Sequence, residues 1–365
     1  MRVFTRQLDL LAEIDSYTNL DFIRRWSSPG EFTFTINRHS PGTQYLQKGN
    51  IISIDNTGRK VGIIKHKEIQ LDSGGKITEN WLIKGWTLSG LTRQRYTAPP
   101  PGEAYDVVTG SAETVMKHYV NNNMITPTDT DRAFPMLVNT TDFNRGDNIT
   151  WRSRFKDLHE ELARISAISG LGWDITINFA NKRYEFDVYT GLNLSANQDT
   201  NPPVIFSPEF DAVEMQRYQD SDLSYKTKAL VGGQGEGIDR ELVVVGGGIG
   251  FDLAEFFVDA RDIENTEELY LRGEERLAES QVDILFEGKI LQTAPFVYQK
   301  DYNLGDIVTV QNVDWGITMD TRIVEVKETY GERGLEVELT FGNRWPTFID
   351  KIKGALKQMD AEVRR

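Results

Sequence analysis

The feature that most constrains this chain is a stretch of alternating apolar and polar residues near its C-terminal end, at 302–345. Three runs within it, 307–310, 323–326 and 335–341, repeat with period two and are separated by Gly and Asp residues. Short period-two runs broken by turn residues are typical of antiparallel strands. The turn at 330–334 contains two glycines, which accept the positive φ of a tight turn. We therefore predict an antiparallel meander here.

The same layout occurs near the N-terminus. Gly49-Asn50-Ile51-Ile52-Ser53-Ile54 matches Gly305-Asp306-Ile307-Val308-Thr309-Val310, at an offset of 305 − 49 = 256. In both places a polar turn, a strand, a Gly turn and a strand ending near a Gly and a Trp follow. Two interpretations are open: one small β-domain present twice, or two unrelated meanders. The shared order of turns and strands favours the duplication.

Several short segments occur in the order found in a known protein family. They are Trp26, Gly30, Phe32 and Phe34 near the start; 84–95, which is similar to a G-x-x-L-x-x-L-x-x-R segment; 229–240, in which a strand leads into G-x-G-E-G and an Arg; and 257–262. With the duplication, they make the chain resemble the tail-hub (baseplate hub or tail-tip) proteins of long-tailed bacteriophages and prophages. The resemblance implies two similar β-barrel domains per subunit, and three subunits whose six barrels form a ring that fits the six-fold tail tube.

We predict a β-rich α+β, multidomain chain: two similar small β-barrel domains plus an inserted α+β domain and a C-terminal helix. A Pro-rich linker at 98–102 ends the first domain. The expected domains are 1–98, the first barrel; 99–200, the insertion; 201–345, the second barrel with a helix at about 264–282; and 346–365, an amphipathic helix.

Three helices have local sequence signals at their ends. Ser111 is a plausible N-cap for a helix that stops at 121–123, and Asn265 caps another helix from Thr266 to about Gln281. A third, at 155–169, has apolar residues at three- and four-residue spacing and ends at Gly170 and Gly172. A hairpin at 173–188 should follow it.

Composition excludes several classes of function. A formal charge of −14 disfavours a general nucleic-acid binder, because such proteins need cationic surface, so no specific nucleic-acid binding is expected. The chain has no Cys and four scattered His, so disulfides are ruled out and a His-based metal site is not expected. No apolar run is long enough for a membrane anchor, and the N-terminus is unlike a secretion signal, so we expect assembly in the host cytoplasm.

Motifs that could carry chemistry are weak. The glycines at 243–250 resemble a dinucleotide fingerprint, but Phe251 stands at its last position and no βαβ pattern surrounds it. Adjacent carboxylates such as Glu160-Glu161 and Glu267-Glu268 are expected on solvated helix faces, and Asp301, Asp306, Asp314 and Asp320 in turns. We expect no enzyme activity, catalytic residue, cofactor or metal.

The resemblance implies a structural virion protein of the tail: a homotrimeric hub that joins the six-fold tube to the three-fold tip. Implied partners are the tail tube or distal tail protein, the tape-measure protein and a tail fibre or receptor-binding protein. The alternative is a tail-associated peptidoglycan hydrolase or glycan-binding module. Candidate subunit-interface residues are Gly232, Gly233, Gly235, Gly237 and Arg240, where glycine lets backbones approach closely.

The last predicted helix has one apolar face. Its residues are Phe348, Ile352, Leu356, Met359 and Val363. With barely two heptads, two arrangements are open: packing on a neighbouring surface, or a short three-stranded seam. We expect this face to be the docking site for a partner.

Overall fold

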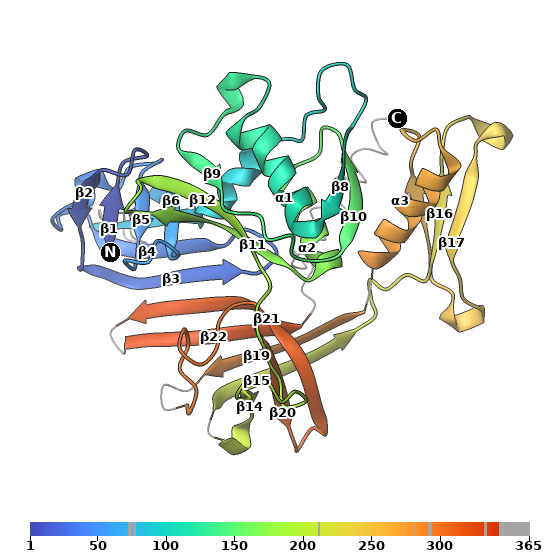
Figure 1. The fold of residues 1–365 in the computed structure, drawn as a ribbon. Helices are drawn as coiled ribbons and strands as arrows, with labels where there is room; N and C mark the ends of the chain where they lie inside the picture. Colours follow the sequence, from blue (N-terminus) through green and yellow to red (C-terminus); the bar gives the residue numbers. More distant parts are fainter. Residues whose placement is uncertain are drawn as a thin grey trace. The chain divides into compact units, whose positions relative to one another are not determined.

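The computed structural model describes residues 1–71, 75, 78–210, 212–280, 282–290, 294–331 and 334–342. They form two compact units (Figure 1). The first consists of Met1–Gln216 and Glu287–Phe341, and the second of Arg217–Phe286 and Gly342, the last described residue. The predicted boundaries after residues 98, 200 and 345 are not tested by this division and stay a prediction.

The N-terminal part of the first unit is one antiparallel sheet region in the order β3-β4-β7-β6-β5-β1-β2. Its strands are β1 (Arg2–Phe4), β2 (Leu10–Glu13), β3 (Tyr17–Arg25), β4 (Glu31–Asn37), β5 (Ile51–Ser53), β6 (Val61–Glu68) and β7 (Asn80–Thr87). Strand β4 alternates between its two faces, with Phe32, Phe34 and Ile36 buried between exposed or half-buried residues. These side chains anchor a core beneath the sheet.

The C-terminal strands repeat this order as β15-β19-β22-β21-β20. They are β15 (Val213–Ser221), β19 (Asp283–Ile290), β20 (Ile307–Asn312), β21 (Ile317–Gly331) and β22 (Gly334–Gly342). Two short strands, β13 (Asn193–Leu194) and β14 (Ile205–Phe206), pair in parallel with β20. The predicted strands at 307–310, 323–326 and 335–341 are confirmed.

Matching hydrogen bonds support the predicted duplication. The amide of Gly49 donates to the carbonyl of Ile64 (2.8 Å), and the amide of Gly305 donates to the carbonyl of Ile323 (2.9 Å). Both glycines have positive φ, 93° and 95°. The register of β6 on β7 shifts directly after Ile64, and that of β21 on β22 shifts directly after Ile323. The two copies therefore share turn geometry as well as strand order.

No closed barrel is found among the described strands, which corrects the expectation of two barrels. Fourteen strands form one open sheet instead. The reason is the length of β21: its first part pairs with β20, and its second part lies between β22 and β3, with Glu325 opposite Arg25 and Tyr330 opposite Leu20. This β3–β21 pairing joins the first copy to the second along their edges (Figure 1).

Between the two copies, residues 106–189 form the helical part of the first unit. It contains α1 (Ala112–Val120), α2 (Leu158–Ser169), β8 (Asp106–Ser111), β9 (Leu137–Asn139), β10 (Asn148–Ser153), β11 (Gly172–Asn178) and β12 (Arg183–Tyr189). The Ser111 cap is confirmed, since its hydroxyl accepts from the amide of Thr114, and α2 ends at Gly170 with φ 71°. The predicted hairpin is β11–β12.

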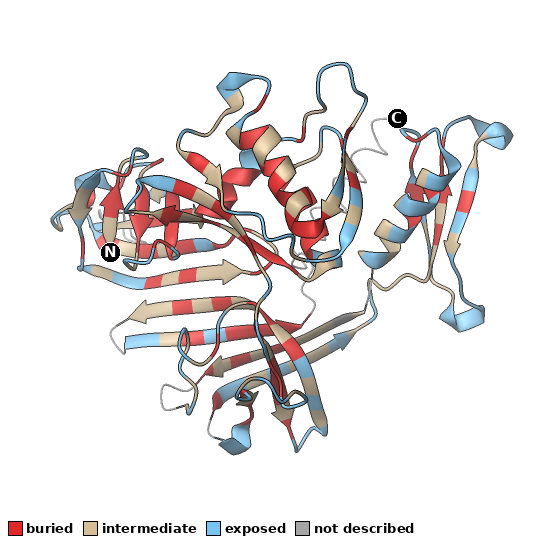
Figure 2. Ribbon diagram, in the orientation of Figure 1, coloured by how far each residue is buried: buried red, intermediate tan, exposed pale blue. Residues whose placement is uncertain are grey.

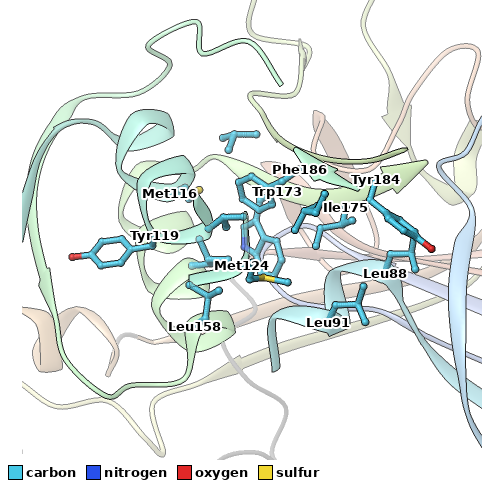
Figure 3. Packing of buried hydrophobic residues seen from close by; sticks show 14 of the residues in the cluster. Leu88, Leu91, Met116, Tyr119, Met124, Leu158, Trp173, Ile175, Tyr184 and Phe186 are labelled. Atoms are coloured by element: carbon cyan, nitrogen blue, oxygen red, sulfur yellow. The ribbon is translucent and has the colours of Figure 1, made fainter. Parts of the chain in front are cut away.

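The two helices and the hairpin enclose a continuous apolar core (Figure 3). Met116 of α1 and Leu158 of α2 lie near Trp173 of the hairpin, and all three are almost completely buried. Tyr119 of α1 is buried as well, but its ring points away from the hairpin, and its hydroxyl donates to the carbonyls of Asp106 and Trp151. Helix α2 begins later than predicted, at Leu158, because Phe155 has a positive φ of 51° and is exposed. Core packing therefore selects the helical segment out of the longer periodic run.

The second unit is a three-stranded sheet with one helix. Its elements are β16 (Lys228–Gly232), β17 (Leu242–Gly246), β18 (Glu255–Asp259) and α3 (Thr266–Ala278). Strand β16 is central, with β17 antiparallel and β18 parallel to it. The Asn265 cap is confirmed, because its side chain accepts from the amide of Glu267. Leu269 of α3 packs in the small core of this unit.

Candidate assembly surface

The described residues hold no group of His, Asp and Glu side chains suited to a metal ion. Asp301 and Asp306 accept hydrogen bonds from backbone amides in turns, as predicted. The glycines at 246–250 lead into a short 3₁₀ turn and then β18, so no α-helix follows at which a pyrophosphate could bind. The motif therefore fails as a dinucleotide site.

One carboxylate pair is placed differently from the prediction. Glu161 is fully buried, not solvated, and accepts hydrogen bonds from the indole of Trp151 (2.9 Å) and the guanidinium of Arg164 (3.1 Å). Its neighbour Glu160 is exposed. Glu161 is thus buried in hydrogen bonds with Trp151 and Arg164, while Glu160 points to solvent. The two carboxylates do not face each other across a cleft as glycosidase chemistry requires.

A buried polar cluster lies at the β3–β21 junction. Nζ of Lys60 lies 2.5 Å from Oε2 of Glu328, and both side chains are almost fully buried. The hydroxyl of Tyr330 also donates to Glu328 (2.5 Å), and Lys60 donates to Tyr330 (3.1 Å). Arg24 donates to the hydroxyl of Tyr298. These five side chains come from both copies, so the cluster holds the two copies in one register.

The electrostatics of this cluster follow from its burial. Burial raises the pKa of Tyr298 to about 12, although Arg24 acts in the opposite direction. Burial, reinforced by Glu328, also raises the pKa of Tyr330. Burial by itself would lower the pKa of Arg24, but Tyr298 and Glu328 raise it above its ordinary value. The two tyrosines therefore stay neutral and Arg24 stays charged near neutral pH.

Next to the cluster, Asp174 on β11 gives a pH-dependent term in stability. Burial raises its pKa to about 6, although Arg24 acts in the opposite direction. Between about pH 4 and pH 6, the carboxyl of Asp174 is therefore protonated in the folded state but ionised in the unfolded state. Stability from this group is therefore complete below about pH 4 and is lost as the pH rises to about 6, by about 1–3 kcal/mol for this half-buried side chain.

Asp174→Asn tests this term, because the amide cannot titrate. Urea unfolding at pH 4, 5, 6 and 7 should show a smaller loss of stability between pH 4 and 6 for the variant than for the parent chain. Asp174→Asn should leave the other titrating groups in place, so the difference between the two profiles isolates Asp174. Two parallel profiles would contradict the prediction.

The predicted interface loop lies in the second unit. Gly232 ends β16, and Arg240 donates to the carbonyls of Gly232 (3.0 Å) and Gly233 (3.1 Å) and pairs with Asp259 (2.7 Å). Arg240 therefore fastens its own loop. Gly235 and Gly237 have positive φ, and no atom lies within 4 Å of a Cβ built on Gly237. The subunit-interface role of these five residues stays a prediction.

Exposed apolar side chains accompany both glycine loops, which the sequence patterns did not reveal. Ile238 follows Gly237 and is fully exposed, and Ile249 and Phe251 flank Gly250 and are almost fully or fully exposed. Both loop tips are coloured as exposed in Figure 2. The predicted docking face, Phe348, Ile352, Leu356, Met359 and Val363, lies outside the described residues.

Comparison with known proteins identifies the family. The family model of the siphovirus ReqiPepy6 Gp37-like protein matches residues 1–343. The chain belongs to this family. No curated protein matches it significantly. The expected resemblance to proteins of long-tailed phages is thereby confirmed across most of the chain.

Three solved structures with a similar fold are tail proteins, two of them described as prophage tail proteins. The 43 kDa tail protein of prophage MuSo2 from Shewanella oneidensis has 13% identity and a TM-score of 0.57, over 93% of this chain and 97% of that one. A tail protein from Neisseria meningitidis MC58 has 14% identity and a TM-score of 0.56, over 93% and 95%. Prophage tail protein gp18 from Listeria monocytogenes EGD-e has 14% identity and a TM-score of 0.50, over 98% of both chains.

The chain therefore shares the fold of these tail proteins along nearly its whole length. Such low identities establish the fold and leave the activity to be argued from the chain itself. No helix in the described part of the chain is long and apolar enough to cross a bilayer.

Proposed function

We propose that this protein is a structural component of the phage tail, the trimeric hub at the tail tip or baseplate. It joins the six-fold tail tube to the three-fold tip. The observation that supports this role is the internal duplication: Gly49 and Gly305 open two strand layouts with the same hydrogen bond and the same register shift. Three chains with two copies each present six similar units, which matches a six-fold partner.

The partners follow from this position. The tail tube or distal tail protein contacts one face of the ring, the tape-measure protein approaches the same end of the tail, and a tail fibre or receptor-binding protein binds the distal side. The net charge of −14 favours basic surfaces on these partners. The loop at 232–240 and the predicted helix at 346–365 are the proposed contact regions.

Absolute mass in solution tests the proposal. Light scattering over a concentration series should give the mass of three chains, about 125 kDa from 41.6 kDa each, either for the pure chain or after the tube protein is added. A monomer under both conditions would contradict the trimeric hub. Clearing of a peptidoglycan zymogram by the pure chain would instead support the hydrolase alternative.

A further inference from the structure

The two copies of the duplicated unit have corresponding strands with different neighbours. The order β3-β4-β7-β6-β5 in the first copy corresponds to β15-β19-β22-β21-β20 in the second. Strand β6 thus corresponds to β21, and β3 corresponds to β15. Because the register shift follows Ile64 in β6 and Ile323 in β21, His66 corresponds to Glu325.

The second half of β21 has a neighbour on both sides. It pairs with β22 on one side and, antiparallel, with β3 of the first copy on the other. Arg25 and Glu325 form a salt bridge of 2.6 Å across this β3–β21 junction, and the hydroxyl of Thr329 donates to Asp21 (2.6 Å). In this junction, the second half of β21 in one copy pairs with β3, the first strand in the order of the other copy.

The corresponding edges, along the second part of β6 and along β15, have one neighbouring strand each. Among the described strands, β6 beyond its register shift pairs with β7, and β15 pairs with β19. Each chain therefore presents two open edges. The edge at 65–70 corresponds to the part of β21 that pairs with β3, and the edge at 213–221, which is β15, corresponds to β3. Open edges carry rows of backbone donors and acceptors that favour pairing with another strand.

We propose that neighbouring subunits join by the same pairing: the 65–70 edge of one chain adds, antiparallel, to β15 of the next chain. The partner is thus a second copy of this chain, and the proposal rests on the hub function proposed above. The two edges differ, so the contact is head-to-tail, and head-to-tail contacts close into rings when the rotation permits. A closed ring then leaves neither edge exposed, as the internal junction already does for β3 and β21.

Ring contacts within each copy give the register of this contact. Phe22 of β3 lies opposite Phe32 of β4, with stacked rings whose centroids are 6.3 Å apart, and Tyr218 of β15 makes a tilted ring contact with Phe286 of β19, also at 6.3 Å. We take these two cross-strand contacts as equivalent, so that Phe22 corresponds to Tyr218. In the internal junction Val326 lies opposite Arg24. Lys67 corresponds to Val326, and Asp220 corresponds to Arg24. In the proposed contact, Lys67 of one chain therefore lies opposite Asp220 of the next.

This register places opposite charges directly across the strand pair, an arrangement that stabilises antiparallel sheets. Lys67 is half-buried, with its ammonium 4.5 Å from the ring centroid of Trp81, and Asp220 is exposed at the other edge. A lysine on an open edge also discourages pairing with unrelated strands. The charge pattern thus favours the head-to-tail contact over a contact between two 65–70 edges, in which lysines would meet.

Cysteine cross-linking of the full chain tests the contact, since the parent chain has no Cys. In the same register, Glu68 lies opposite Gln219, because Lys327 lies opposite Ile23 in the internal junction. The variant Glu68→Cys/Gln219→Cys is treated with a short bismaleimide, with the tube protein present if it is needed for assembly. Each single variant is treated in parallel. The matched control is Glu68→Cys/Gln44→Cys, which moves the second cysteine to an exposed glutamine away from both edges.

The double variant should run as a covalent trimer on denaturing gels, and an equal mixture of the two single variants should stop at covalent dimers. The control and each single variant alone should remain uncross-linked. Dimers from Glu68→Cys alone would overturn the proposal, because two like edges would then meet. A trimer by light scattering without cross-links would overturn this contact and leave the hub function standing. A chain that stays monomeric even with tube protein overturns both.

Charge reversal gives a second, independent readout of the register. Lys67→Glu or Asp220→Lys should each raise the subunit concentration at half-assembly about tenfold, and the double reversal should recover most of the loss. Lys48→Glu, an exposed lysine outside both edges, should have little effect. Thermal unfolding of each variant shows whether the fold is retained. Additive losses in the double reversal would overturn the Lys67–Asp220 register.

Discussion

Replacing Lys60 by Met is expected to destabilise the first unit by about 3 kcal/mol. The ammonium of Lys60 lies 2.5 Å from the carboxylate of Glu328, and only 6% and 1% of the two side chains are exposed. Met keeps the apolar stem but removes the charge, so the carboxylate remains buried with the hydroxyl of Tyr330 as its direct partner. The loss lies at the lower end for a broken buried pair, because Arg24 still attracts Glu328.

Urea unfolding monitored by tryptophan fluorescence measures this loss. The control is Lys60→Met/Glu328→Leu, which replaces both charges with apolar side chains of similar size. It should lose less stability than Lys60→Met, since no carboxylate remains buried without its ammonium partner, although Arg24 loses the attraction of Glu328. A single variant as stable as the double variant would show that Glu328 does not depend on Lys60.

Gly305→Ala should lower the free energy of unfolding by about 3–5 kcal/mol, for two separate reasons. The φ of Gly305 is 95°, a conformation that L-residues rarely adopt. A Cβ at this position would also lie 2.0 Å from the ring of Trp26. Trp26 has little room to move, because its indole donates to the carbonyl of Gly170 (3.1 Å) and its ring lies against Gly172. Backbone strain and overpacking therefore add.

Gly49→Ala is the matched control, because the duplication supplies the same glycine in another environment. Its φ is 93°, but the added Cβ would meet the guanidinium of Arg6, the mobile end of a long side chain. The free energy of unfolding of this variant should fall by only about 1–2 kcal/mol, which is the contribution of backbone strain at positive φ. The difference between the two variants, measured by urea unfolding, reports the packing of Trp26. Equal losses would mean that the ring yields at little cost.

Local signals predicted the elements well. Ser111 and Asn265 cap the first turns of α1 and α3, and Gly170 ends α2, as expected. These caps were predictable because a cap depends on hydrogen bonds within one turn of chain. Period-two runs predicted β20, the second part of β21, and β22, since alternation reports which face of a strand is buried. The start of α2 was placed at 155 instead of Leu158, where tertiary packing decides.

Long-range features escaped prediction for a common reason. The ion pair of Lys60 and Glu328 joins residues 268 positions apart, and Arg25 pairs with Glu325 over 300 positions. No local pattern marks either charge as buried. Glu161 looked like a solvated helix residue, yet it is buried, and its carboxylate accepts a hydrogen bond from the indole of Trp151 on β10 as well as from Arg164 of its own helix.

The sequence by itself determined the strands, the helix caps and the presence of two similar strand layouts. Each of these depends on neighbouring residues or on direct comparison of two segments. Only the tertiary structure decided that the layouts share one open sheet in place of two closed barrels. That outcome depends on which edge β21 pairs with beyond residue 323, and strand pairing is a choice among distant partners that short-range patterns do not specify.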